Sequence, residues 1–421
     1  MVGSSSQCGA VLRRTGLEAR SHILRSNMVP ELRRAFNAEF TPEKYGNFVA
    51  RLHEACGTEV QFRLCETPCF FPATFLEEIA KAGKELVFSL MDSPDYLRKS
   101  DATIPPEWNV PNEDPRPLFL QVDFGLLRDT AGALKPCLVE LQAFPSLYAY
   151  QPEMARTYIE SYGLSPHLRL YLSGLDDISY RRLLETAIVG DHERENVVLL
   201  EVDPFRQKTL PDFLLTRKLL GIPIVDIREV VKRGSKLHYR ADGRLIPIER
   251  IYNRTIVDEL VRKNVRLPFD YRDELEVEWA GHPNWYFRIS KFSLPYLKHP
   301  SVPKTWFLSE VNELPTDREN YVLKPLYSFA GAGITFGPTD EQIAAVPEEK
   351  RRDYILQERV NFARVIETPH GPTQPEIRIM YVWQGELTPV MALIRMGRGK
   401  MMGVDHNKDL EWVGSSAALL A

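Results

Sequence analysis

The chain has 421 residues, of which 44% are apolar and 26% are charged, and its formal net charge is −4. This balance is ordinary for a globular protein and gives room for two or three domains. The slightly acidic charge provides no general attraction for nucleic acid or for an anionic membrane. We therefore expect no nucleic-acid partner. No run of eighteen apolar residues occurs, so we also expect no membrane-spanning helix.

Five cysteines are an odd number in a chain of this size, which favours reduced thiols and a cytoplasmic setting. Cys65 and Cys69 have no second pair of ligands nearby, so we interpret them as an incidental pair in a loop. Residues 1–28 lack the apolar segment of a secretory signal. We interpret them as a disordered tail, or as the product of an upstream translation start when the natural N-terminus lies near Met28.

The first structured region is predicted to be helical. Apolar positions within 30–53 favour two helices that are broken at 41–42, and 74–83 is another helix candidate. The segment 93–117 is rich in proline, aspartate and asparagine, which predicts an irregular loop on the surface.

The next segment has the pattern of a β-hairpin, with strands at 118–124 and 137–142. Both strands are apolar enough for a core, yet they carry Asp123 and Glu140, and a buried carboxylate needs a partner. Antiparallel pairing can bring the two acids together, and Gln142 lies on the same face as Glu140. Two carboxylates and an amide oxygen suit Mg²⁺. The alternative is a hairpin whose two acids face solvent.

A βαβ unit follows, with strands at 197–202 and 222–227 around a helix at 209–220, which predicts a parallel sheet. The strand 250–254 ends in polar groups, including Arg254, at the edge where α/β sheets usually bind ligands. The segment 284–298 is predicted to be a helix that carries Lys291.

A strand at 321–323 delivers Lys324 to the small residues of 328–333, and a strand at 354–356 is followed by Gln357-Glu358. This pattern indicates a phosphate site built from a lysine and a flexible loop. It is neither a P-loop nor the dinucleotide fingerprint, because the glycine spacing matches neither motif. A plain hairpin with a glycine-rich turn is the alternative.

The last segments are predicted to be two paired strands, 376–381 and 387–393, joined by a turn at 384–385. Arg378 lies in the first strand and Arg395 follows the second, close to Arg398. Arginines beside a phosphate-type loop favour an anion cluster. The alternative is an amphipathic edge strand.

From Leu118 onward, the order of these motifs resembles that of circularly permuted ATP-grasp ligases, such as glutathione synthetase and glutathionylspermidine synthetase. The sequences VDF and VELQ stand upstream, followed by IYNR, RISK, VLKP and YILQERV. The resemblance implies an α/β (α+β) ATP-grasp fold in permuted order with a Rossmann-like domain. It divides the chain into residues 1–28, residues 29–190 with the metal-binding strands at 118–142, a substrate domain at 191–290, and a nucleotide-binding region at 291–421.

The resemblance also implies roles for individual residues. Lys291 and Lys324 would contact the phosphates of ATP, and Arg378 and Arg395 would stabilise the transferring phosphoryl group. Arg254 would face the acceptor carboxylate. The remaining positions are the lid at Ser328, Gly331 and Gly333, the adenine hinge at Gln357, Glu358 and Val360, the ribose ligand Glu376, and the Mg²⁺ ligands Asp123, Glu140 and Gln142.

Two positions depart from the family pattern. The family's E-x-N motif is E-x-Q here, at Gln142, and the glutamate that follows the strand lysine by four residues is replaced by Ser328. The expected activity is ATP-dependent ligation of a carboxylate to an amine through an acyl phosphate, with ATP and Mg²⁺ as cofactors. The alternatives are an ATP-binding regulatory or scaffold protein and a small-molecule phosphotransferase. A homodimer is expected from the resemblance alone.

Overall fold

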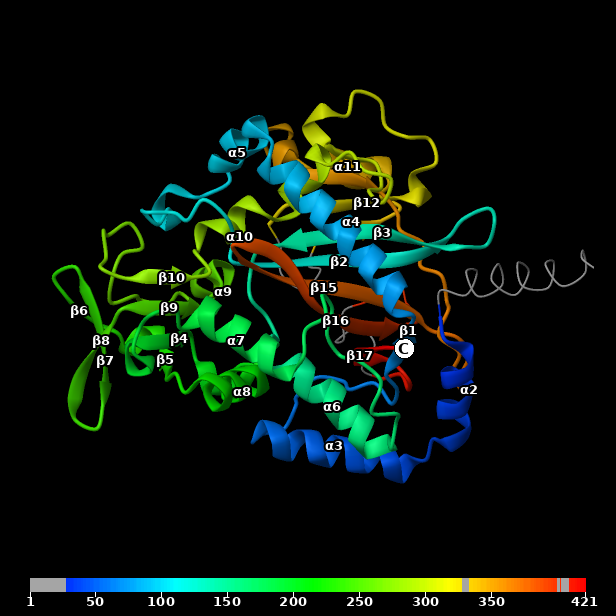
Figure 1. Ribbon diagram of the computed structural model, residues 1–421. Coiled ribbons are helices and arrows are strands. Elements are labelled where there is room, and N and C mark those ends of the chain that lie inside the picture. Colours follow the sequence, from blue (N-terminus) through cyan, green and yellow to red (C-terminus); the bar gives the residue numbers. More distant parts are fainter. Residues whose placement is uncertain (1–27, 328–332, 400–401, 403–408) are drawn as a thin grey trace, which may run out of the picture.

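The computed structural model describes residues 28–327, 333–399, 402 and 409–421. Its largest sheet has six strands in the order β1-β17-β16-β15-β2-β3, and only β1 and β17 run parallel (Figure 1). The expected hairpin is confirmed as β2 and β3, and the expected C-terminal pair as β15 and β16. The strands are β1 (Cys69–Phe71), β2 (Phe119–Arg128), β3 (Leu134–Gln142), β15 (Gln374–Gln384), β16 (Glu386–Gly397) and β17 (Gly414–Leu420).

Strand β15 contributes to an apolar core on one face and carries charged side chains at its start on the other, because successive side chains point to opposite sides of a sheet. Ile377 and Ile379 belong to the core that packs beneath α4 (Ala73–Met91). Glu376 and Arg378 therefore lie on the face away from α4. That face carries the charged residues described below.

A second sheet is parallel, with the order β10-β9-β4-β5. The predicted βαβ unit is confirmed, because β4 and β5 pair in parallel and α8 connects them in the sequence. Gly221 ends α8 at a φ of 74°. From β4 the chain first adds β5 on one side, and it later adds β9 and then β10 on the other side. The elements are β4 (Val197–Glu201), α8 (Leu210–Leu220), β5 (Ile224–Asp226), β9 (Arg250–Asn253), α9 (Val257–Arg262) and β10 (Glu278–Ala280).

Two smaller sheets complete the described strands. The antiparallel sheet β11-β14-β12-β13 carries the predicted lysine strand, and β6-β7-β8 forms a separate meander. Their strands are β6 (Val231–Arg233), β7 (Lys236–Ala241), β8 (Arg244–Ile248), β11 (Thr305–Phe307), β12 (Tyr321–Pro325), β13 (Thr335–Phe336) and β14 (Tyr354–Glu358).

The predicted break between the first two helices is confirmed, because Thr41 caps the second helix by accepting a hydrogen bond from the backbone N–H of Lys44 at 3.2 Å. The prediction of an irregular loop across 93–117 is wrong in part. Ser93 caps a helix there, and the proline that follows suits its first turn. The helices are α2 (Pro30–Glu39), α3 (Pro42–Cys56), α5 (Pro94–Asp101), α6 (Tyr150–Tyr162), α7 (Asp177–Ile188), α10 (Asn284–Arg288) and α11 (Asp340–Ala344).

The single helix predicted across 284–298 is also wrong. Helix α10 ends at Arg288, extended backbone follows, and a short 3₁₀ helix then runs over Lys291–Tyr296. Pro295 lacks the N–H that a continuing α-helix needs, and Ser290 caps the second turn instead. Within the described ranges, no helix combines the length and the apolar character that crossing a membrane requires.

Candidate functional site

Charged side chains form a row across the middle of the six-stranded sheet. In the strand register, Arg378 of β15 stands opposite Asp123 of β2, and Asp123 stands opposite Glu140 of β3. One step along, Glu376 of β15 stands opposite Arg395 of β16. We call these five residues the charged row. The register of four strands therefore gathers residues from both ends of the chain.

Asp123 is the centre of the charged row, and its side chain is only 1% exposed. Arg378 donates two hydrogen bonds to it, Nε to Oδ1 at 2.6 Å and Nη2 to Oδ2 at 2.7 Å, and Arg395 donates another to Oδ2. Burial alone would raise the pKa of the Asp123 carboxyl, but the two guanidinium groups hold this pKa below its ordinary value. Both carboxylate oxygens are thus occupied by arginines.

Glu376 is the second buried acid of the row, and it pairs with Arg395. Burial, reinforced by the neighbouring charges of Asp123 and Glu140, raises the pKa of Glu376 to about 7, although Arg395 opposes the shift. This value puts the carboxyl within the range of pKa values that suit proton transfer near neutral pH.

Lys324 lies on β12, and its Nζ donates a hydrogen bond to Oε1 of Gln357 on β14 at 2.6 Å. The amide of Gln357 donates in turn to the hydroxyl of Thr305 at 3.0 Å, which fixes its orientation. Burial lowers the pKa of Lys324 to about 8. The side chain of Gln357 therefore holds the lysine, and the role of this position in an adenine hinge stays a prediction.

The charged row and the two predicted phosphate lysines face the same region. Glu140 raises the pKa of both Lys291 and Lys324 by electrostatic attraction, against the burial that lowers both values. Lys324 also interacts electrostatically with Lys291 and Glu376. Residues from distant parts of the sequence thus meet between the six-stranded sheet and the β11-β14-β12-β13 sheet.

The remaining residues of the predicted nucleotide site are placed as follows. Ser328 and Gly331 lie outside the described residues. Gly333 has a φ of 74°, and a Cβ there would lie 3.1 Å from Pro325, so a larger residue would be strained. Glu358 accepts a hydrogen bond from the backbone N–H of Lys304 at 3.2 Å, and Val360 follows β14.

Arg254 is buried, at 2% exposure, and donates a hydrogen bond from Nη1 to Asp212 at 3.0 Å. Its guanidinium lies over the rings of Phe144 and Phe213. Asp212 also accepts hydrogen bonds from backbone N–H groups near the start of α6, including that of Tyr150. The geometry gives Arg254 a structural partner, and its predicted contact with an acceptor carboxylate stays a prediction.

The three predicted Mg²⁺ ligands do not form a preformed metal site. Asp123 is saturated by arginines, and the amide oxygen of Gln142, in the orientation that satisfies its neighbours, accepts from Arg378 Nη1 at 2.8 Å. Only Glu140 is left, with its side chain 35% exposed and 3.8 Å from Arg378. In the described ranges, no group of three or more His, Cys, Asp or Glu side chains could hold a metal ion.

Gln121 is a member of this site that the sequence analysis did not single out. Its Oε1 accepts from Arg378 Nη1 at 2.9 Å, and its Nε2 donates to the carbonyl of Ser146 at 2.8 Å. The period of a strand indicates this position, since Gln121 is two residues from Asp123 and therefore lies on the same face.

Comparison with known proteins supports the fold. No family model and no curated protein matches the sequence. Among solved structures, the chain is similar to a glutathione synthetase-like effector from Globodera pallida in its apo form, with a TM-score of 0.55 and 11% sequence identity. The match covers 90% of this chain and 99% of that one. The chain therefore has a glutathione synthetase-like ATP-grasp α+β fold, and at this identity the likeness concerns the fold alone.

Proposed function

We propose that the protein is an ATP-dependent carboxylate–amine ligase that forms an amide and releases ADP and phosphate. The observation that carries the proposal is the convergence of Lys291, Lys324 and Glu140 on one region of an ATP-grasp fold. These two half-buried lysines provide the positive charge that holds and stabilises a transferring phosphoryl group. The substrates are a small-molecule carboxylate and a small-molecule amine.

In the proposed reaction, a carboxylate oxygen of the substrate attacks the γ-phosphorus of ATP and the bond to the β,γ-bridging oxygen breaks. ADP leaves and an acyl phosphate forms. The amine nitrogen then attacks the acyl carbon, phosphate leaves with the carbon–oxygen electron pair, and the amine releases a proton. Lys324, held by Gln357, is assigned to the phosphates. Among the predicted Mg²⁺ ligands, Glu140 is the single available carboxylate in this arrangement, so these residues do not fit a metal ion as they stand.

A second candidate is an ATP-binding protein without ligase turnover, acting as a regulatory or scaffold module. One observation favours it: Arg378 and Arg395 are both paired with Asp123, so neither is presented free to a phosphoryl group. The serine at position 328, where the family has a glutamate, points the same way.

An ADP-release screen separates these candidates. The full-length protein is incubated with ATP, Mg²⁺ and pooled carboxylates and amines, and ADP is measured with and without each pool. A ligase releases ADP only when both substrates are present, and Lys324→Ala abolishes that release. Saturable ATP binding with no ADP across the panel would support the non-catalytic candidate. Full ADP release by Lys324→Ala would contradict the assignment of this lysine.

A further inference from the structure

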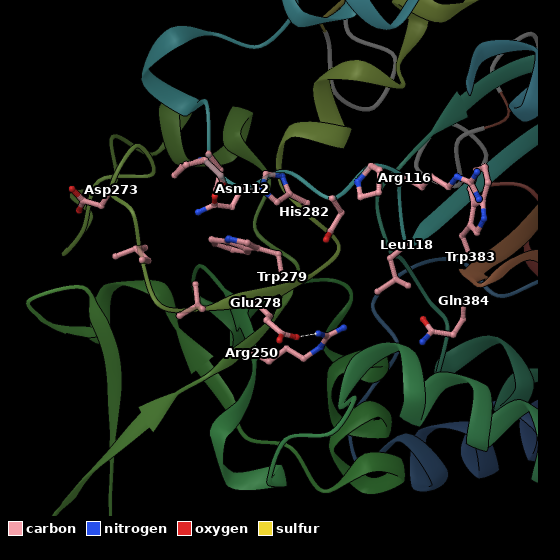
Figure 2. Close-up of a pocket in the computed structure, with 16 residues that line it drawn as sticks. Asn112, Arg116, Leu118, Arg250, Asp273, Glu278, Trp279, His282, Trp383 and Gln384 are labelled. Carbon is pink, nitrogen blue, oxygen red and sulfur yellow. Dashed lines mark hydrogen bonds and ion pairs between the residues drawn. The ribbon is translucent and has the colours of Figure 1, made fainter. Parts of the chain in front are cut away.

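A second hollow lies away from the charged row, with a volume of about 560 Å³. It forms where the loop 110–118, the edge strand β10 and the turn between β15 and β16 meet (Figure 2). Its size is typical of small-molecule pockets. Trp383 lines it and lies about 16 Å along β15 from Arg378, at about 3.3 Å per residue. A small molecule bound here would not contact the charged row.

Two charged groups that line this hollow form no ion pair within the described residues. Arg116 is exposed and its guanidinium lies 4.9 Å from the ring centre of Trp383, and over the described ranges it forms no ion pair. Asp114 is also at an exposed position, and its carboxylate has neither an ion pair nor a hydrogen-bond donor in the same part of the chain. Partial burial raises the pKa of this carboxyl, and the charge of Arg250 opposes the shift. The hollow thus offers one cation and one carboxylate to a ligand.

The other charged groups that line the hollow are already compensated. Arg250 forms an ion pair with Glu278, as Figure 2 shows, and Asp273 pairs with Lys232 at 2.9 Å. They therefore compete less for a ligand than Asp114 does.

Apolar side chains form part of the wall between these charges. Trp279 is 8% exposed and Trp383 is 7% exposed, and Leu118 and Val277 also line the hollow. Figure 2 shows Arg116 and Trp383 at one end and Trp279 with His282 toward the other. Tryptophan rings bind large apolar side chains well because they offer much rigid surface.

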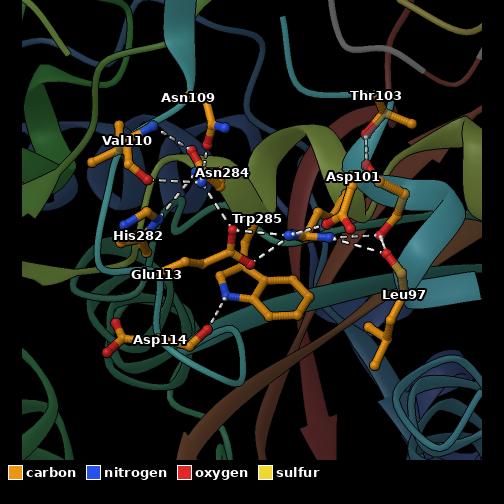
Figure 3. Close-up of polar contacts among 12 residues, drawn as sticks. Leu97, Asp101, Thr103, Asn109, Val110, Glu113, Asp114, His282, Asn284 and Trp285 are labelled. Atoms are coloured by element: carbon orange, nitrogen blue, oxygen red, sulfur yellow. Dashed lines mark hydrogen bonds and ion pairs between the residues drawn. The ribbon is translucent and has the colours of Figure 1, made fainter. Parts of the chain in front are cut away.

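The loop that carries Arg116 and Asp114 is held in place by a network of hydrogen bonds (Figure 3). Asn284 of α10 bonds both the N–H and the carbonyl of Val110, each at 3.0 Å. Trp285 Nε1 donates to the carbonyl of Asp114 at 3.1 Å. Arg288 forms an ion pair with Glu113, Nε to Oε1 at 2.6 Å. The wall of the hollow is therefore preformed, which reduces the entropic cost of binding.

The charge pattern decides between classes of ligand. A phosphorylated ligand carries two or more negative charges, and the hollow has one unpaired cation among Asp114, Asp273 and Glu278. A divalent cation needs several oxygen ligands, and no group of three suitable side chains occurs in the described residues. A purely apolar ligand that covered Arg116 and Asp114 would displace their water without offering either of them a charged partner.

We propose that this hollow is a binding site for a zwitterionic α-amino acid with a large apolar side chain. The ligand carboxylate pairs with Arg116, its ammonium group pairs with Asp114, and its side chain packs against Trp279 and Trp383. The site is independent of the proposed ligase function and lies outside the region assigned to it.

Isothermal titration calorimetry of the full-length protein at pH 7 tests the proposal with matched ligands. L-Phenylalanine is expected to bind saturably. N-acetyl-L-phenylalanine, which lacks the ammonium charge, and L-phenylalaninamide, which lacks the carboxylate, are each expected to bind at least about tenfold more weakly. Glycine, which lacks the side chain, is expected not to bind. Absence of phenylalanine binding, or equal binding of either singly charged analogue, would overturn the proposal.

Two exposed-loop variants locate the site. Arg116→Gln is expected to weaken phenylalanine binding at least about tenfold while leaving phenylalaninamide binding unchanged, and Asp114→Asn is expected to show the converse with the acetylated ligand. Arg182→Gln, an exposed arginine on α7, is the matched control and should bind all ligands as the wild type does. Wild-type binding by both loop variants would place phenylalanine elsewhere and contradict the proposal.

Discussion

Arg378 and Asp123 stand directly opposite each other on paired strands and share two parallel hydrogen bonds of 2.6 and 2.7 Å. Their side chains are 10% and 1% exposed, so the pair is shielded from water. Such geometry favours the ion pair once it is formed, but it leaves a buried charge if either partner is removed. The pair therefore makes the charged row part of the structure as well as of the candidate site.

Asp123→Asn is expected to lower the free energy of unfolding by about 3–5 kcal/mol, because Arg378 and Arg395 would lose their shared counter-charge inside the protein. Urea unfolding at pH 7 measures this change. The matched control is Arg51→Gln, which breaks an exposed pair with Glu160 and is expected to cost less than about 1 kcal/mol. Equal effects of the two substitutions would mean that burial of the Asp123 pair has no energetic consequence.

Gly83→Ala is expected to destabilise the protein by about 1–3 kcal/mol, even though alanine favours helices. A Cβ at this position of α4 would lie 2.0 Å from the hydroxyl oxygen of Tyr381, which donates a hydrogen bond to the carbonyl of Ala80 at 2.8 Å. The tyrosine would have to move and abandon that bond. Urea unfolding again provides the measurement.

Gly46→Ala is the control for that prediction. Gly46 lies within α3, and a Cβ there would meet no atom within 4 Å. The substitution is expected to stabilise the protein by about 0.5–1 kcal/mol, because alanine loses less backbone entropy in a helix. Destabilisation by both substitutions would indicate that the contact with Tyr381 is not the cause.

The sequence alone was enough to pair Asp123 with Glu140, because a two-residue period and a short turn determine a hairpin locally. It was not enough to pair Asp123 with Arg378, since that contact depends on the register between β2 and β15, which lie far apart in the chain. The same reason applies to Arg254. Its burial depends on Phe144 and Phe213, which tertiary packing brings to it.

The two errors in local structure have different origins. The helix at α5 carried a recognisable start, Ser93 followed by proline, which the abundance of loop-forming residues obscured. The break after α10 depends on capping by Ser290 and on Pro295. A serine that can cap a turn and a proline five residues later together favour such a break.

Glu201 is predicted to make stability depend on pH. Burial raises the pKa of its carboxyl to about 8, although the N–H of Val202 and the charge of Arg254 oppose the shift. Glu259 raises this pKa further and Lys263 lowers it. Between about pH 4.5 and 8 the folded state retains a proton that the unfolded state has released, so the contribution of Glu201 to stability falls as the pH rises.

Replacing this carboxyl by an amide removes that titration. Glu201→Gln is expected to match the wild type near pH 5 and to be more stable than the wild type at pH 8, by an amount on the order of a few kcal/mol. Urea unfolding at several pH values between 5 and 8 measures the difference. Glu193→Gln, at an exposed position, serves as the control and should give the same difference from the wild type at every pH. If the free energy of unfolding of Glu201→Gln also differed from that of the wild type by the same amount at every pH, the prediction would be contradicted.

Lys324 is predicted to make nucleotide binding depend on pH. Burial lowers its pKa to about 8, so the ammonium group that attracts phosphate is lost as the pH rises through that value. The affinity for ATP is expected to be constant below pH 7 and to fall by up to about tenfold for each pH unit above 8. Equilibrium binding of ATP between pH 6.5 and 9.5 measures this dependence.

Two substitutions make the assignment specific to this side chain. Lys324→Arg keeps its charge across the whole range and is expected to bind ATP with little change up to pH 9.5, because guanidinium does not titrate there. Lys324→Gln is expected to bind weakly at every pH, without the fall above pH 8. If Lys324→Gln bound ATP as tightly as the wild type at pH 7, the lysine would not contact phosphate. If the wild type and Lys324→Arg lost affinity in parallel, another group would be responsible for the titration.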